Sequence, residues 1–304
     1  MKKYILKRII MSVITVLILI TVVFFLVRLM PGGPFTNPKL TPEVKAVMEA
    51  YYGLDKPLPV QYVQYLKNLL HGDLGYSMSY SNQTVTSLIL KAFPYSADVG
   101  IRALVFAFSV GIVLGIIAAL NRGKKLDFLC IIIAIIGTSV PDFIMGGILQ
   151  YFFGIRWGLL PIAQYKGIEY TILPMISLGF ATLASVSRIM RSSMLEVVNQ
   201  DYIKTARAKG ISEFQVITRH EIRNAIMPLV TIMGPLVASI LTGTFVIESI
   251  FAIPGMGKYY VDSISSLDYT MVLGMTVFYG VLLVIATTIT DIVYGLVDPR
   301  IRVS

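Results

Sequence analysis

The chain has 304 residues, of which 56% are hydrophobic and 14% are charged, and its formal net charge is +9. An average soluble domain has about 25% charged residues. This much apolar surface exceeds what one core can bury, so lipid must cover the remainder, which predicts an integral membrane protein. Because a basic soluble domain is missing, the positive charge does not predict binding to nucleic acid.

Six apolar stretches are long enough to cross a bilayer of about 30 Å, which takes about 20 residues. Lipid offers no partner to free backbone groups, so each stretch is predicted to be a helix. The predicted fold is therefore an all-α polytopic membrane protein with six transmembrane helices. They run approximately over Ile9–Met30, Val99–Leu120, Phe128–Phe153, Ile172–Ile189, Ala225–Ile247 and Thr270–Val297. The first is expected to be an uncleaved span, because LVRLMPGGP has no small-residue cleavage pattern.

The distribution of basic residues predicts the orientation in the membrane. With the N-terminus in the cytoplasm, the C-terminus is also cytoplasmic, and 16 of the 26 lysines and arginines fall on the inner face. These are Lys2, Lys3, Lys7, Arg8, Arg122, Lys124, Lys125, Arg188, Arg191, Lys204, Arg207, Lys209, Arg219, Arg223, Arg300 and Arg302. The net charge is therefore explained mostly by topology.

Residues 1–30 contain the N-terminal tail and the first span, and residues 98–304 form the predicted five-helix core. The segment between them, residues 31–97, is too polar for lipid. It is predicted to form a helical cap on the outer surface. One helix is expected to start at N-cap Thr41 with Pro42 and to end at Gly53. A second is expected from Pro59 to His71, stopping at Gly72, and a third from Val85 until Pro94 breaks it. The cap is either a lid over the bundle or a surface that receives a partner.

Residues that would indicate catalysis or metal binding are missing from the pattern. Cys130 is alone, so no intramolecular disulfide is expected. His71 and His220 fall on opposite sides of the predicted membrane, so they cannot form one metal site. No GxxxxGK[ST] phosphate loop, nucleophile elbow or HExxH occurs. The chain is expected to bind no cofactor or metal and to have no catalytic residues of its own.

The segment Asn199–Pro228 is short and basic, and it lies between two apolar runs on the inner side. A helix over Asp201–Lys209 with an apolar face of Tyr202, Ile203 and Ala206 is predicted to end at Gly210, which suits a left-handed C′ position. A second helix should start at Ser212, with Gln215 completing a capping box. The small Ala206 and Ala208 would let this hairpin dock closely onto a partner. Lys204, Arg207 and Lys209 either contact acidic or phosphate groups or only set the topology.

At this loop the sequence resembles a known family. TARAKG followed by RHEIRNAIMP is similar to the EAA loop of membrane subunits of ATP-binding-cassette importers, in the OppB/DppB branch of oligopeptide and dipeptide permeases. Lys204, Thr205, Ala206 and Gly210 stand where the generic loop has Glu-Ala-Ala and its glycine, so the glutamate is absent. The likeness extends to Met30–Pro34, Tyr52–Ser77, Ser139–Gly146, Glu248–Gly257 and Asp298–Arg302.

The resemblance implies a type I importer fold in the bacterial cytoplasmic membrane. It implies a second, homologous permease subunit of OppC/DppC type, two cytoplasmic ATPase subunits that carry ATP and Mg, an extracytoplasmic peptide-binding protein, and a peptide substrate. Nickel permeases of the branch share much of the pattern, so a metal chelate is the alternative substrate. The residues expected to couple to the ATPases, within loop 190–225, are Asp201, Tyr202, Thr205, Ala206, Arg207, Ala208, Gly210, Ser212, Gln215, His220 and Arg223.

Candidates for the translocation pathway come from charges and helix breakers inside the spans. An ionisable residue at the helix centre costs about 2.5–3.5 kcal/mol on insertion scales. Asp142, after Pro141 in the third span, either faces the cavity or makes a structural hydrogen bond at a proline kink. Pro228, Gly234 and Pro235 would make the fifth span bendable, as a gating helix requires. A secondary transporter driven by an ion gradient would instead show paired charges and inverted repeats, which these spans do not display.

Overall fold

The computed structural model describes residues 2–35, 41–242 and 244–297, and within them the regular structure is helical. Asp298–Arg302, including Arg300 and Arg302, and the glycine at 243 lie outside the described residues. The helices are α1 Lys2–Leu29, α2 Pro42–Tyr51, α3 Leu58–Leu70, α4 Val85–Leu120, α5 Lys125–Ser139, α6 Asp142–Leu149, α7 Glu169–Val198, α8 Asp201–Ala208, α9 Glu213–Gln215, α10 Ile222–Ala225, α11 Met227–Thr242, α12 Thr244–Ile250, α13 Met256–Ser265 and α14 Tyr269–Val297, with π-helical turns at Gln150–Arg156 (η1) and Val216–Glu221 (η2).

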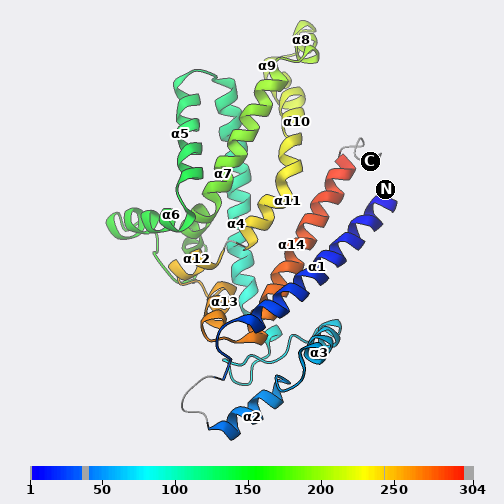
Figure 1. The fold of residues 1–304 in the computed structure, drawn as a ribbon. Coiled ribbons are helices and arrows are strands. Elements are labelled where there is room, and N and C mark those ends of the chain that lie inside the picture. The colour runs from blue at the N-terminus through cyan, green and yellow to red at the C-terminus, as the bar shows by residue number, and fades with distance from the viewer. Residues whose placement is uncertain (1, 36–40, 243, 298–304) are drawn as a thin grey trace.

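The long helices form two groups (Figure 1). α1 and α14 pack side by side, and α4, α5 and α7 form a second group that α11 joins to α14. The start of α1, the end of α14 and the helix α8 lie on one side of the molecule, whereas α2, α3 and α13 lie on the other. The predicted cap and the predicted inner loop are therefore at opposite ends of the bundle.

The third predicted span, Phe128–Phe153, is wrong as a single helix. α5 ends at Ser139, and the helix that starts at Asp142 leaves it at an angle of 111°. The break follows from Pro141, which lacks an amide hydrogen and pushes the preceding residue out of the helical region. Val140 accordingly has extended dihedrals, φ −94° and ψ 120°.

Of the fifth predicted span, Ala225–Ile247, the structure describes α11 as far as Thr242 and α12 from Thr244, and residue 243 between them lies outside the described residues. In the described part of the chain, α1, α4, α7 and α14 are each long and apolar enough to cross a membrane, and the bent pair of α5 with α6 and η1 makes up to five. Several apolar spans are thus confirmed, whereas the count of six stays a prediction. α7 runs beyond the predicted Ile172–Ile189 at both ends.

The predicted break at Pro94 is wrong, because α4 continues through it from the cap into the membrane. A proline inside a helix costs about 3 kcal/mol. Both flanks of Pro94 are packed, however: Leu88 belongs to one buried cluster with Met271, and Val99 belongs to another with Leu173. Van der Waals packing of both flanks against neighbouring helices therefore offsets the cost of the proline.

The predicted cap helices are confirmed at their ends. Thr41 caps α2 by accepting a hydrogen bond from the amide of Val44 at 3.4 Å. α2 ends before Gly53, with φ +67°, and α3 ends before Gly72, with φ +74°. In both turns the backbone hydrogen bonds follow the Schellman pattern that a left-handed glycine permits.

A buried carboxylate fixes the cap to the membrane core. Asp268, at the start of α14 and 0% exposed, accepts hydrogen bonds from the hydroxyl of Ser77 and from the amides of Met78 and Ser79. It also caps its own helix through the amide of Met271. Neither this anchor nor α13 was predicted from the sequence.

Glycines bring α4 and α7 into close backbone contact. A Cβ atom added at Gly115 would lie 2.6 Å from the carbonyl oxygen of Ser187, and one added at Gly111 would lie 2.9 Å from that of Leu183. Small residues at such positions let membrane helices approach backbone to backbone. No larger side chain fits either place without separating the helices.

Candidate functional site

The segment Asp201–Glu221, which we call the hairpin, projects from the end of α7 at one end of the molecule (Figure 1). Its own small core holds it together: Ile203, Ala206 and Val216 are buried against one another, with Ile211 beside them. The predicted apolar face of α8 is therefore confirmed for Ile203 and Ala206. Tyr202 instead points outward and is 44% exposed.

The turn at Gly210 has the predicted left-handed geometry, with φ +74°. The amide of Gly210 donates to the carbonyl of Arg207 at 3.0 Å, and the amide of Ile211 donates to that of Ala206 at 3.4 Å. This is the Schellman motif, completed by the apolar contact between Ile211 and Ala206. The turn is therefore defined by hydrogen bonds and packing on both of its sides.

The predicted capping box at Ser212 is wrong. Ser212 has the extended dihedrals of an N-cap, but its side chain caps no amide. Its carbonyl accepts from Val216 at 2.9 Å, and the chain then passes at once into the π-helical turn η2. Gln215 is exposed. The second arm of the hairpin is held by charges instead of by a cap.

Arg207 is the residue that joins the two arms. Its guanidinium donates to both carboxylate oxygens of Glu213, at 3.2 and 2.7 Å, and to Glu221 at 3.0 Å. The Glu221 side chain is 0% exposed, and burial raises the pKa of this carboxyl above its ordinary value, partly offset by Arg207. Arg207 therefore serves the hairpin's own structure.

The outer surface of the hairpin presents a mixed set of groups. Lys204 pairs with Asp201 at 2.9 Å, and the Thr205 hydroxyl bonds back to the Asp201 carbonyl at 3.0 Å. Ala208 is exposed, as predicted, whereas Ala206 is inside and cannot meet a partner. Phe214 is 75% exposed and was missed, although a bulky apolar residue beside a predicted helix start is a signal for a contact surface.

Two predicted coupling residues lie at or beyond the end of the hairpin. His220 is half-buried in η2, where its carbonyl accepts from the Asn224 side chain at 2.7 Å. Arg223 is exposed on α10. Both lie on the path from the hairpin to α11, so they continue the hairpin toward the membrane.

The helix break beside Pro141 opens a cavity of about 430 Å³, with Asp142 in its wall. Asp142 is half-buried at the first position of α6, and its main-chain carbonyl accepts a hydrogen bond from the Ser177 hydroxyl at 2.6 Å. The bond at the kink is therefore made by the backbone of Asp142. The cavity is lined by Gly137, Thr138, Ser139, Val140, Pro141, Asp142, Phe143, Ala181, Val246 and Ile247.

The helix breakers of the fifth predicted span occupy different environments. Pro228 is exposed in the first turn of α11, where a proline is tolerated. Pro235 lies inside α11, and the helix continues past it. Gly234 is buried close to α14, since a Cβ atom there would lie 3.1 Å from Thr290. The proposed bending of this helix stays a prediction.

Comparison with known proteins agrees with this architecture. The model of the family described as "Binding-protein-dependent transport system inner membrane component" matches residues 111–303, and that of its N-terminal membrane component matches residues 1–100. The chain is 45% identical over 303 residues to the dipeptide transport system permease protein DppB of Bacillus subtilis, covering 99% of this chain and 98% of that protein. It is 42% identical over 305 residues to the oligopeptide transport system permease protein OppB of Haemophilus influenzae, covering 99% and 100%.

Two solved structures share the fold at low sequence identity. One shows inward facing conformations of the MetNI methionine ABC transporter, with a TM-score of 0.56 and 16% identity, covering 70% of this chain and 97% of that chain. The other is an amino acid ABC transporter with histidines, with a TM-score of 0.52 and 15% identity, covering 71% and 94%. The chain has a type I importer fold, and it belongs to the family of inner-membrane components of binding-protein-dependent transport systems, in its OppB/DppB branch.

Proposed function

We propose that this chain is the permease subunit of an ATP-driven peptide importer and forms half of its translocation pore. The observation that carries the proposal is the identity of 40–45%, along nearly the whole chain, to dipeptide and oligopeptide permeases. The same relatives favour a peptide over the metal chelate that the sequence left as an alternative. As a transport subunit of this family, the chain has no ATPase site of its own.

The partners of such a subunit follow from the importer architecture. We infer a second, homologous permease of OppC/DppC type, two cytoplasmic ATPases that carry ATP and Mg, and an extracytoplasmic peptide-binding protein. The hairpin would meet an ATPase on the cytoplasmic side. The start of α1 and the end of α14 lie at the same end as the hairpin, which supports cytoplasmic positions for both ends of the chain (Figure 1).

The hairpin is built to transmit force. Moving a two-state equilibrium from 1:99 to 99:1 takes about 5.5 kcal/mol of differential binding. A flexible loop would deform instead of transmitting that free energy, whereas the hairpin has a buried core, a Schellman turn and an arginine that joins its arms. We propose that Tyr202, Ala208 and Phe214, which are exposed, contact the ATPase directly.

The cavity beside Asp142 is our candidate for part of the peptide pathway. It lies where the membrane helix breaks, and irregular backbone at membrane depth is tolerated where it lines a cavity. Among the described residues no ion pair to the Asp142 carboxylate is found, so this group is available to a peptide amine or to a base of the second permease. α11, with Gly234 and Pro235, is the proposed gating helix.

Reconstitution tests the function. Vesicles containing this chain, the second permease and the two ATPases, supplied with the binding protein, should accumulate labelled tripeptide only when ATP is enclosed with the ATPases. A nickel chelate should not compete with the peptide. Accumulation by this chain alone, driven by a proton or sodium gradient, would overturn the proposal and favour a secondary transporter.

A further inference from the structure

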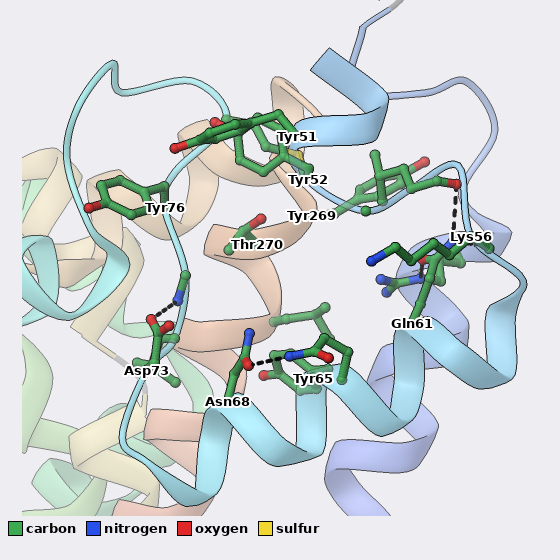
Figure 2. Close-up of a pocket in the computed structure, with 18 residues that line it drawn as sticks. Tyr51, Tyr52, Lys56, Gln61, Tyr65, Asn68, Asp73, Tyr76, Tyr269 and Thr270 are labelled. Atoms are coloured by element: carbon green, nitrogen blue, oxygen red, sulfur yellow. Dashed lines mark hydrogen bonds between the residues drawn. The ribbon is translucent and has the colours of Figure 1, made fainter. Parts of the chain in front are cut away.

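A second cavity, of about 400 Å³, lies at the opposite end of the molecule from the hairpin, between the cap and the start of α14. We call it the outer pocket (Figure 2). Its volume is within the range of about 300–1,000 Å³ that is typical of small-molecule sites. It is lined by Arg28, Tyr51, Tyr52, Gly53, Leu54, Lys56, Gln61, Gln64, Tyr65, Asn68, Asp73, Leu74, Gly75, Tyr76, Met78, Tyr269, Thr270 and Leu273.

Five tyrosines line its walls, and they come from four separate parts of the chain. Tyr51 and Tyr52 stand on one side, Tyr65 opposite them on α3, and Tyr76 and Tyr269 between (Figure 2). Aromatic rings supply apolar area together with a polar hydroxyl, a combination that suits ligands of mixed character.

One of these tyrosines has an unsatisfied group. The hydroxyl of Tyr65 is buried and has no hydrogen-bond partner among the described residues. Burial raises the pKa of this phenol to about 12, so it is neutral and able both to donate and to accept. A buried polar group without a partner is costly, so a ligand that drew this hydroxyl into contact would remove that cost.

The pocket carries opposite charges on its two sides. Asp73 stands at one side and Lys56 at the other (Figure 2), with Arg28 joined to Gln61 near the latter. One oxygen of Asp73 accepts from the amide of Gly75 at 2.8 Å, which leaves the second oxygen available. Neither Asp73 nor Lys56 has a salt bridge within residues 2–35, 41–242 and 244–297.

The walls are held in place by specific contacts, so the pocket does not depend on a ligand to form. The Gln61 amide donates to the carbonyls of Leu54 and Lys56, at 3.1 and 2.8 Å, and thereby fixes the loop that carries Lys56. On the other side Gly75 has φ +83°, and a Cβ atom there would lie 2.7 Å from Thr270. Only glycine permits this close approach.

We propose that the outer pocket binds a short peptide with free termini, with its ammonium group at Asp73 and its carboxylate at Lys56. The side chains of the peptide lie between the tyrosine rings. The proposal rests on the proposed function, because it assigns to the permease itself a receiving site for the transported class of molecule. Opposed charges of this kind match a zwitterion, which pairs with both, whereas an anionic lipid headgroup would pair only with the cations and leave Asp73 unpaired.

The dimensions favour a small ligand over a docked protein. Stable protein interfaces bury about 800 Å² on each partner and are broad, whereas this site is a pocket of about 400 Å³ with exposed charges on its two sides. A binding protein that inserted one charged side chain would pair with either Asp73 or Lys56 and leave the other unpaired. A peptide with both termini free uses both.

The test uses the assembled transporter in lipid nanodiscs without its binding protein, and it measures equilibrium binding of labelled Ala-Phe-Ala. Asp73→Asn and Lys56→Gln should each weaken binding by about tenfold or more, since each removes a charge-assisted contact. The matched controls Asp55→Asn and Lys67→Gln change exposed charges outside the pocket and should leave binding unchanged. N-acetylated peptide should lose its sensitivity to Asp73→Asn, and C-amidated peptide its sensitivity to Lys56→Gln.

Saturable binding that neither pocket substitution alters would overturn the inference, as would no saturable binding to the wild type. If instead the substitutions lower the affinity for the binding protein and no peptide binds, the pocket is a docking site for that protein and the inference fails. ATP-driven uptake in the presence of the binding protein tests the proposed function separately. Uptake that persists without peptide binding at the pocket refutes only the inference, whereas loss of uptake from the intact transporter refutes the function.

Discussion

The guanidinium of Arg191 donates two hydrogen bonds to the carboxylate of Asp127, from Nε to Oδ1 at 2.6 Å and from Nη2 to Oδ2 at 2.9 Å. This bidentate pair joins the inner half of α7 to the start of α5. The amide of Gly123 donates to the same carboxylate at 2.9 Å, so the short turn between α4 and α5 is held as well. Arg191 is thus a structural residue as well as one of the positive charges that predict orientation.

Replacing Asp127 with alanine should destabilise this end of the bundle. The Asp127 side chain is 4% exposed and that of Arg191 is 27% exposed, so the arginine would lose its partner in a site that water only partly reaches. The expected loss is about 1.5–3 kcal/mol, the usual range for hydrogen bonds to charged groups. Thermal unfolding of the purified protein in one detergent measures it. Lys125→Ala, nearby on the same helix, is the control, and an equal effect of the two substitutions would contradict the assigned role.

Asp268→Asn should loosen the cap. If the asparagine oxygen accepts from Ser77, Met78 and Ser79, its NH₂ group faces the Met271 amide and cannot accept from it, so at least one buried donor is left unpaired. The cost is about 1–3 kcal/mol. Limited proteolysis should then cut between residues 76 and 84 faster than in the wild type. An unchanged cleavage rate would show that the cap is anchored elsewhere.

Gly210→Val should separate ATP hydrolysis from uptake. Nothing lies within 4 Å of a Cβ atom built there, so the effect comes from the backbone, whose φ of +74° costs an ordinary residue about 1–2 kcal/mol. We expect uptake to fall at least about tenfold while the ATPase rate of the complex is largely retained, given the differential energy that coupling requires.

Gly210→Asn is the matched control, because asparagine tolerates left-handed backbone better than a β-branched residue. It should keep most of the uptake. Wild-type uptake in the valine variant would argue against force transmission through this turn.

The buried Glu221 predicts a pH dependence of the hairpin. Burial raises the pKa of its carboxyl above 4.5, so the folded hairpin binds this proton more tightly than the unfolded segment does. The stability that this group contributes is complete below pH 4.5 and is lost as the pH rises through its raised pKa. Hydrogen exchange of residues 201–221 should therefore slow when the pH is lowered from 7 toward 5, after correction for intrinsic exchange.

Glu221→Gln should remove that dependence while leaving the hairpin folded. Glutamine keeps an oxygen to accept from Arg207 and avoids the cost of a buried charge, and Arg207 retains Glu213. If the exchange rate of this variant still depends on pH as in the wild type, the effect belongs to another titratable group.

Asp142→Asn distinguishes the two interpretations of this residue. If the carboxylate contributes to the pathway, uptake of peptides with a free amino group should fall more than uptake of N-acetylated peptides. Ser177→Ala removes the 2.6 Å hydrogen bond to the Asp142 backbone, and it should affect both kinds of peptide equally. Unchanged uptake of every peptide by Asp142→Asn would leave only a structural role.

Features set by neighbouring residues could be predicted from the sequence, and features set by distant ones could not. The caps and turns at Thr41, Gly53, Gly72 and Gly210 depend on a few adjacent residues, and the structure has each one where it was expected. Pro94 and Pro141 give the same local signal. Only the second breaks its helix, because packing on both sides of Pro94 keeps α4 continuous.

The same distinction applies to the sites. The apolar core of the hairpin follows from helical spacing, so Ile203 and Ala206 were predicted to share a face. The bond from Arg207 to Glu221 spans 14 positions, and that from Arg191 to Asp127 spans 64. No periodicity connects residues so far apart. The outer pocket likewise needs the cap folded onto α14, because α14 supplies Tyr269, Thr270 and Leu273 to its walls.

The glycine contacts between α4 and α7 predict which parts of the protein move together. With Gly115 against the Ser187 carbonyl, these two helices are in backbone contact over the halves that lie nearer the hairpin. We therefore expect them to move as one rigid unit. Because the hairpin follows α7 and the far end of α4 reaches the cap, a displacement of the hairpin would be carried by this unit from one end of the molecule to the other.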